Sequence, residues 1–177
     1  MFGIRTSGRI ALAGLLLSAV GLPASAHVTL EAHEAPAHSY FKAQFLAGHG
    51  CDGAATTSIQ VTIPEGVVGV KPMPKPGWTL TTADGPYAHP LQVHGKTVTS
   101  GVATVTWTGG PLPDAWSDEF MLVAQLPDLP AGTIVYFPVV QQCQGAVKHW
   151  DQIPGVAGAV PPLKNPAPAL TLTARAP

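Results

Sequence analysis

The chain has 177 residues, of which 46% are hydrophobic and only 11% are charged, and its formal net charge is −1 at pH 7. This balance excludes a basic nucleic-acid-binding protein and a protein that docks on anionic membranes through positive charge. With 19 glycines and 19 prolines, the composition favours short strands joined by tight turns over helices.

The first segment, residues 1–26, has the layout of a secretory signal peptide. Arg5 and Arg9 precede an apolar stretch from Ile10 to Leu22, and the small-residue cleavage site Ala24-Ser25-Ala26 follows. A membrane anchor is the alternative interpretation, but the apolar stretch has about 13 residues, whereas a spanning helix needs roughly 20. We therefore expect cleavage at this site, export to the periplasm and a mature form without a membrane span.

Cleavage would leave a mature chain of 151 residues that begins with His27. Because Arg5 and Arg9 are removed with the first 26 residues, seven basic residues remain against ten acidic ones, a net charge near −3. This length fits one domain, since two domains of half the size would each be too small for an adequate core.

Alternation of apolar and polar residues at a period of two predicts short strands along the mature chain. Pro-rich residues 71–77 cannot continue a strand ladder, so they predict a loop. The expected strands lie at Val28 and Leu30, Tyr40–Phe45, Thr57–Ile63, Trp78 and Leu80, Leu91–Val93, Val102–Trp107, Glu119–Gln125, Thr133–Gln141, Ala146–Trp150 and Leu170–Ala174.

About nine or ten short strands separated by turn signals are typical of an all-β, two-sheet antiparallel β-sandwich. We expect this single sandwich domain to occupy residues 27–155. The stretch 155–169 is rich in Pro, Gly and Ala and has the composition of an extended surface linker. Residues 156–177 are therefore interpreted as a Pro/Ala-rich C-terminal extension that can carry one last strand.

Two cysteines, Cys51 and Cys143, remain in a chain that we expect to enter an oxidising compartment. An even count there favours a disulfide. The alternative is a Cys-ligated Cu(I) or zinc site, for which the chain lacks any Cys-x-x-Cys spacing. Closing a loop of about 90 residues stabilises a fold by roughly 4 to 5 kcal/mol if chain entropy dominates.

An N-terminal histidine offers two nitrogens to one metal ion. The α-amine and the Nδ1 atom of His27 close a six-membered chelate without help from the fold, and both are ordinary metal donors near neutral pH. Cu(II) heads the divalent affinity order and accepts square-planar nitrogen and oxygen donors. The sequence therefore predicts an exported Cu(II) site at His27, with two further equatorial positions to be filled.

Glu34 is the favoured oxygen donor, because seven residues after His27 it can lie where the strand turns back. Glu31 competes, although it lies four residues along the same strand, at about 3.3 Å per residue. Both carboxylates could equally be solvated surface groups. His33, His38 and His149 are alternative imidazole donors that could also be ordinary surface histidines.

Trp150 stands seven residues after Cys143, where a turn and a return strand would carry it across the sheet. Core packing is the usual role of a tryptophan. We assign Trp78, Trp107 and Trp116 to packing.

Several separated motifs resemble those of the YcnI-like (DUF1775) family, and the likeness runs over about residues 24–155. They are His27-Val28-Thr29-Leu30 after the Ala-x-Ala site, the Pro-Lys-Pro-Gly-Trp motif ending at Trp78, Asp118-Glu119-Phe120, Tyr136-Phe137-Pro138-Val139-Val140-Gln141 and His149-Trp150. The resemblance implies an exported copper-binding protein with a β-sandwich domain.

The resemblance also implies a single-histidine brace for Cu(II). His27 would give its amine and ring nitrogen, Glu34 would complete the site, and Trp150 would lie beside the metal. Only Met73 and Met121 remain as thioethers after cleavage, which argues against Cu(I) storage by methionine clusters. We expect a copper carrier or chaperone, not an enzyme, that passes Cu(II) to another exported or membrane copper-handling protein.

Two other functions remain open. A polysaccharide-oxidising copper enzyme also begins with histidine, but it needs a second histidine in the brace and a flat aromatic face. A structural or adhesive surface sandwich needs no metal, and His27 would then be only the residue at which the peptidase cuts.

Overall fold

The computed structural model describes residues 27–93, 95–156 and 162–176, so the predicted signal peptide lies outside the described residues. No helix long and apolar enough to cross a membrane occurs in this part of the chain. The described residues form twelve strands: β1 (Val28–Leu30), β2 (Glu34–Pro36), β3 (Tyr40–Ala47), β4 (Thr56–Thr62), β5 (Val68–Pro72), β6 (Trp78–Val93), β7 (Lys96–Leu112), β8 (Asp118–Gln125), β9 (Ile134–Tyr136), β10 (Val139–Cys143), β11 (Ala146–Trp150) and β12 (Ala169–Thr173).

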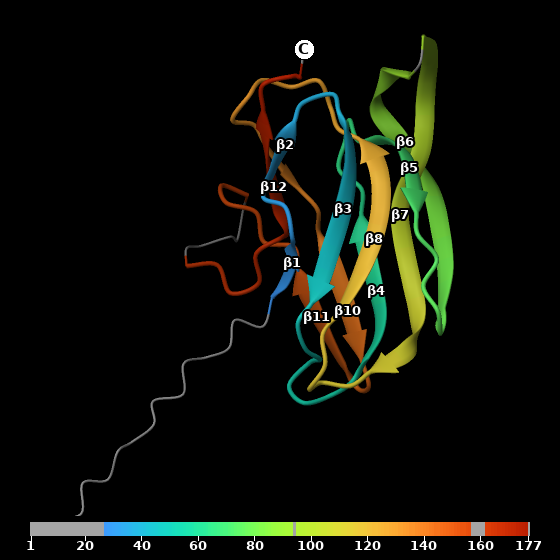
Figure 1. The fold of residues 1–177 in the computed structure, drawn as a ribbon, viewed down its shortest axis with the longest axis vertical. Helices are drawn as coiled ribbons and strands as arrows, with labels where there is room; N and C mark the ends of the chain where they lie inside the picture. Colours follow the sequence, from blue (N-terminus) through green and yellow to red (C-terminus); the bar gives the residue numbers. More distant parts are fainter. Residues whose placement is uncertain (1–26, 94, 157–161, 177) are drawn as a thin grey trace, which may run out of the picture.

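The strands form a sandwich of two main sheets with a smaller third sheet beside them (Figure 1). The four-stranded sheet has the order β1-β3-β8-β5, the five-stranded sheet β11-β10-β4-β7-β6 and the three-stranded sheet β2-β12-β9. The predicted all-β sandwich is confirmed. The third sheet was not predicted, and its β2–β12 pair is parallel, whereas we expected two purely antiparallel sheets.

The third sheet arises because the N-terminal segment changes partners after β1. The backbone N–H of Glu31 still donates to Gln44 of β3, at 3.0 Å, but the carbonyl of His33 accepts from Thr171 of β12, at 2.8 Å. No short hairpin constrains these strands, since they lie at opposite ends of the chain, so the parallel pairing is permitted.

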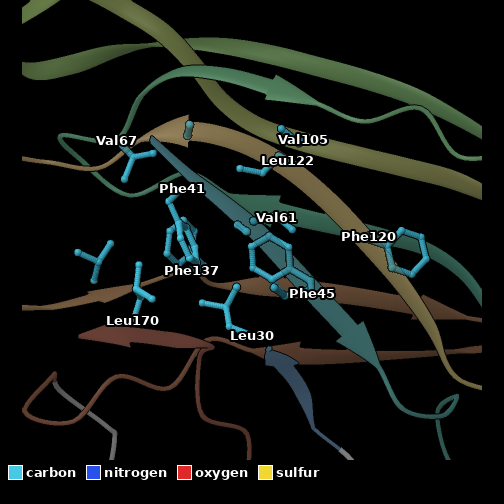
Figure 2. Close-up of a cluster of buried hydrophobic side chains, with 14 of the residues drawn as sticks. Leu30, Phe41, Phe45, Val61, Val67, Val105, Phe120, Leu122, Phe137 and Leu170 are labelled. Carbon is cyan, nitrogen blue, oxygen red and sulfur yellow. The ribbon is translucent and has the colours of Figure 1, made fainter. Parts of the chain in front are cut away.

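The core lies between the two main sheets. In β3 every second residue points inward, so Phe41, Ala43, Phe45 and Ala47 are buried. The Phe45 ring meets Phe137 edge-on, with 5.7 Å between ring centroids, and Figure 2 shows both among the surrounding aliphatic side chains. Burying a phenylalanine side chain contributes roughly 1.5 to 3 kcal/mol relative to leaving it exposed, so the inward-facing residues hold the sheets together.

Two predicted strand boundaries are wrong. The expected strand Thr133–Gln141 is two strands, because Pro138 has no N–H to donate to a ladder and the chain passes there from the three-stranded to the five-stranded sheet. Residues 78–93 and 96–112, predicted as three short strands, form one long antiparallel hairpin of β6 and β7, interrupted by register shifts at Ala83/Asp84 and Pro86/Leu91.

The segment after residue 155 returns to the sandwich. We predicted that the domain ends at 155 and that a linker with one possible last strand follows; that strand is present as β12, but its Leu170 and Leu172 are fully buried in the core of the sandwich. Ala167 is also buried, and its backbone N–H donates to the Gln152 carbonyl at 3.0 Å. Residues 157–161 and 177 lie outside the described residues. Packing therefore extends to Thr173.

Replacing Leu170 with Ala tests whether the last strand is part of the folding unit. Leu170 is fully buried, so removing its side chain leaves a cavity, and we expect the free energy of unfolding to fall by about 2 to 5 kcal/mol. Urea unfolding of the mature protein measures this change.

The matched control is Leu129→Ala, since Leu129 is 44% exposed and its loss should change stability by less than about 0.5 kcal/mol. An equally small change in both variants would mean that the last strand is a detachable extension.

Candidate metal centre

His27 and Trp150 come together where an edge strand of each main sheet ends. His27 immediately precedes β1, at the edge of the four-stranded sheet, and Trp150 is the last residue of β11, at the edge of the five-stranded sheet. Their ring centroids are 5.3 Å apart and the planes meet at 65°. Residue alternation in β11 turns Trp150 inward and its neighbour His149 outward. The structure thus places the two side chains in direct contact.

The His27 ring has a second contact that defines its donor atoms. Its Nε2 lies 3.0 Å from the backbone carbonyl of Lys164. A carbonyl oxygen only accepts hydrogen bonds, so Nε2 carries the proton, and in the neutral ring the lone pair is on Nδ1. Nδ1 is the nitrogen that can chelate a metal together with the α-amine. If the chain is cleaved before His27, these two nitrogens are donors of the kind that Cu(II) accepts.

The contacts of the His27 ring with Trp150 and with the Lys164 carbonyl both depend on the end of β11. Gln152, two residues after Trp150, holds the segment that carries the Lys164 carbonyl. The Asn165 N–H donates to the side-chain oxygen of Gln152 at 2.9 Å, and the Gln152 N–H donates to the Asn165 carbonyl at 3.1 Å. The C-terminal segment is thereby fixed beside His27.

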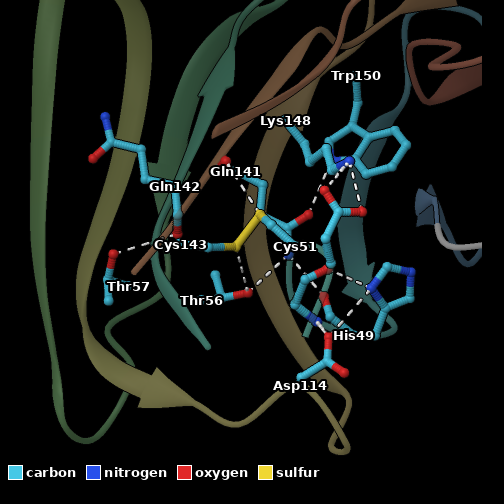
Figure 3. Close-up of a disulfide and its surroundings, with 12 residues drawn as sticks. His49, Cys51, Thr56, Thr57, Asp114, Gln141, Gln142, Cys143, Lys148 and Trp150 are labelled. Carbon is cyan, nitrogen blue, oxygen red and sulfur yellow. Dashed lines mark hydrogen bonds and ion pairs between the residues drawn. A yellow bond between two sulfur atoms is a disulfide. The ribbon is translucent and has the colours of Figure 1, made fainter. Parts of the chain in front are cut away.

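The Trp150 indole is held by a buried glutamine (Figure 3). Its Nε1–H donates to Oε1 of Gln141 at 3.0 Å. The Gln141 side chain is 1% exposed, and its Nε2 donates to the His49 carbonyl and to Oγ1 of Thr56, both at 2.8 Å. Every polar atom of the glutamine side chain therefore has a partner.

The predicted disulfide is confirmed and lies beside this glutamine. Cys51 and Cys143 are joined across 92 residues of sequence, and neither is a free thiol. The Thr56 hydroxyl, which accepts from Gln141, lies 3.8 Å from the Cys143 sulfur. Figure 3 shows the disulfide, Thr56 and Gln141 grouped on one side of Trp150.

An open hollow of about 250 Å³ lies beside His27. It is lined by His27 and β1, by His33 and by residues 166–169. Glu34 is not among the lining residues. It is exposed on β2, directly after His33 and paired with Thr171. The structure therefore brings His33 to the same hollow as His27 and places Glu34 one residue beyond it.

The other candidate donors do not line this hollow. Glu31 is exposed and directly follows Leu30, the last residue of β1. His38 lines a different hollow with Gln125, whose Nε2 is 3.3 Å from His38 Nε2. His149 is exposed, with its Nδ1 3.7 Å from an oxygen of Asp151. Among the described residues, no three side chains of His, Cys, Asp or Glu gather closely enough to hold a metal.

Of the tryptophans assigned to packing, two are packed and one is not. Trp107 is fully buried, and Trp78 packs against Phe120 with 4.9 Å between ring centroids. Trp116 is 65% exposed, so its assignment was wrong. It lies in the turn between β7 and β8, where no sheet covers it.

Sequence reasoning missed Gln141 and the Lys164 carbonyl. Gln141 occupies an inward position of β10, between buried Val139 and Cys143, and a polar residue at such a position was a usable signal. The Lys164 carbonyl had none, because a backbone group acquires its role only through the path of the chain.

Comparison with known proteins finds one family and a related structure. The family model described as "Domain of unknown function (DUF1775)" matches residues 27–172. No curated protein matches the chain. A solved structure of an uncharacterized protein from Nocardia farcinica, described as revealing an immunoglobulin-like fold, is 29% identical, with a TM-score of 0.61. The match covers 83% of this chain and 98% of that one.

Removing the disulfide should loosen the region around Gln141. We expect the paired substitution Cys51→Ala and Cys143→Ala to lower the free energy of unfolding by about 2 to 5 kcal/mol, because the unfolded chain regains the conformations that the bridge excludes. Chemical denaturation with and without a reductant measures the loss.

Reductant should destabilise the native protein and leave the paired variant unaffected. Equal stability of both proteins without reductant would show that the bridge does not stabilise the fold.

Proposed function

This chain belongs to the DUF1775 family, and from that membership we propose that it is an exported Cu(II)-binding protein that carries copper in the periplasm. The observation that supports this most directly is the hydrogen bond between Nε2 of His27 and the Lys164 carbonyl, at 3.0 Å. It assigns the ring proton to Nε2, so that Nδ1 is the ring nitrogen that carries the lone pair a metal would need. Once the signal peptide is removed, the α-amine of His27 becomes the second donor.

The proposed ligands are the two nitrogens of His27 and a carboxylate oxygen of Glu34. Glu34 is solvent-exposed, so its carboxylate does not have to leave a buried partner to reach a metal. Nitrogen and carboxylate donors in a tetragonal arrangement suit Cu(II). The Lys164 carbonyl, by holding Nε2–H, would orient the ligating ring as outer hydrogen-bond partners of metal-bound histidines commonly do.

Trp150 is proposed to lie beside the bound ion without ligating it. Its indole is 3% exposed and contacts the His27 ring, and its only polar atom is already bonded to Gln141. The side chain can therefore exclude water from one side of the ion and restrict the imidazole. The hollow beside His27, which Trp150 does not line, is open to solvent-borne donors.

A bound ion that Trp150 shields and that remains accessible through the open hollow suits a carrier. An incoming donor from another exported or membrane copper-handling protein can approach through the hollow and replace one ligand at a time. A copper site held by one residue's chelate and few other ligands releases its ion more readily than a closed shell. We therefore propose transfer of copper, not turnover of a substrate.

Acetylating the α-amine of His27 tests the chelate. An amide nitrogen is a poor donor, so the acetylated protein loses a direct ligand. Loss of an outer partner costs about 10- to 100-fold in metal affinity, so we expect Cu(II) affinity to fall by more than about 100-fold. Competition titration against a Cu(II) chelator gives the affinity, and electron paramagnetic resonance reports the nitrogen ligands.

The acetylated protein is assembled by ligating a synthetic N-terminal peptide, acetylated at His27, to the rest of the mature chain. The matched control is assembled in the same way from the unacetylated peptide. Equal affinity with and without acetylation would refute the terminal chelate. Release of oxidised oligosaccharides from a polysaccharide, with copper, reductant and peroxide present, would instead favour the oxidising enzyme.

Two variants, Glu34→Gln and His33→Gln, identify the donor beyond His27. We expect Glu34→Gln to weaken Cu(II) binding by at least about tenfold, since outer partners alone are worth that much, and to leave the number of coupled nitrogens unchanged. Electron paramagnetic resonance spectra and Cu(II) competition titrations are compared between Glu34→Gln and His33→Gln.

His149→Gln is the control, because His149 is exposed on the outward face of β11 and its loss should change nothing. If only His33→Gln weakened Cu(II) binding and removed a nitrogen coupling, the ligand would be the His33 imidazole and not the Glu34 carboxylate.

A further inference from the structure

We propose that Gln141 is the positioning residue of the copper site, fixing the Trp150 indole and through it the ring of His27. The inference rests on the proposed copper function and adds to it a residue that cannot touch the ion. Gln141 lies in β10, one strand in from the edge of the five-stranded sheet, and its side chain is buried.

The orientation of the Gln141 amide follows from its partners. The indole N–H of Trp150 can only donate, so it must face the amide oxygen, at 3.0 Å. The His49 carbonyl can only accept, so it must face the amide nitrogen, at 2.8 Å. In the reversed orientation the amide nitrogen would face the indole N–H, both of them donors, and the amide oxygen would face the His49 carbonyl, both of them acceptors. One orientation of Gln141 is therefore compatible with its surroundings.

The glutamine is anchored on the disulfide side of the sandwich. Its amide nitrogen bonds the His49 carbonyl, two residues before Cys51, and Thr56 Oγ1 at 2.8 Å. Gln141 itself lies two residues before Cys143, the other half of the bridge. The Gln141 amide oxygen that accepts from Trp150 is thus held by the two segments that the disulfide joins, those around Cys51 and Cys143.

A fixed indole restricts the histidine. Trp150 meets the His27 ring at a centroid distance of 5.3 Å, and the Lys164 carbonyl holds Nε2 of the same ring. Without its acceptor, the buried indole N–H would be unsatisfied, and the ring would shift to recover a partner. The imidazole would then lose a contact that restricts it before metal arrives.

The central test is a double-mutant cycle in the mature protein, with Gln141→Met and Trp150→Phe. Methionine approximates the shape of glutamine without its hydrogen bonds, and phenylalanine keeps a ring without the indole N–H. We expect each single variant to bind Cu(II) about tenfold more weakly and to shift the resonance parameters of the bound ion. We expect the double variant to bind no more weakly than Trp150→Phe, since Gln141 acts through the indole.

Gln142→Met is the matched control, because Gln142 is the exposed neighbour on the same strand and should bind Cu(II) as the native protein does. Additive losses in the double variant, or unchanged affinity and spectra in Gln141→Met, would overturn the positioning role.

Thr56 provides an independent pair of variants if Gln141→Met fails to fold. Thr56→Val has nearly the same shape but removes one anchor of the glutamine, and Thr56→Ser restores the hydroxyl. We expect a severalfold loss of Cu(II) affinity in the first variant and recovery in the second. A folded Thr56→Val protein with native affinity and spectra would contradict the proposal.

Failure of the copper function would be seen separately, as a mature native protein that does not bind Cu(II). In that case, proton exchange of the Trp150 indole N–H, followed by nuclear magnetic resonance, still tests the positioning. Slow exchange in the native protein and fast exchange in Gln141→Met would support it. Equally fast exchange in both would refute it.

Discussion

The hydrogen bond between the Trp150 indole and the Gln141 side chain is the interaction on which the candidate site depends. It joins the end of an edge strand to the buried interior of the five-stranded sheet, at 3.0 Å. A buried N–H without an acceptor costs about 1 to 3 kcal/mol, so the position of the indole is coupled to that of the glutamine. The face presented to His27 is accordingly set from inside the sandwich.

The candidate site also depends on the two ends of the described chain meeting. His27 immediately precedes the first strand, and its ring nitrogen bonds a backbone carbonyl 137 residues away. The same C-terminal segment leads into β12, whose Leu170 and Leu172 fill the core. Burial of these leucines therefore holds the segment that orients the imidazole. A deletion that removed β12 would affect both stability and the site.

The third sheet explains why a sandwich can present such a site at its edge. The N-terminal segment pairs first with β3 and then with β12, so it passes from one sheet to another beside the hollow. His27 directly precedes β1 and His33 directly precedes β2, and both line the same hollow. A strand that stayed in one sheet would have continued along the edge of that sheet.

The sequence by itself determined the all-β sandwich and the disulfide, and it singled out His27 and Trp150 as candidate site residues. Alternation fixes which residues can be buried, and an even cysteine count favours pairing in a chain that the sequence predicts to be exported. Tertiary structure alone decided the parallel third sheet, the exposure of Trp116 and the parts played by Gln141 and the Lys164 carbonyl. Strand periodicity says which face a residue occupies, but not which distant strand pairs with it. Contacts between residues far apart in sequence arise only when the sheets pack, so a local pattern does not contain them.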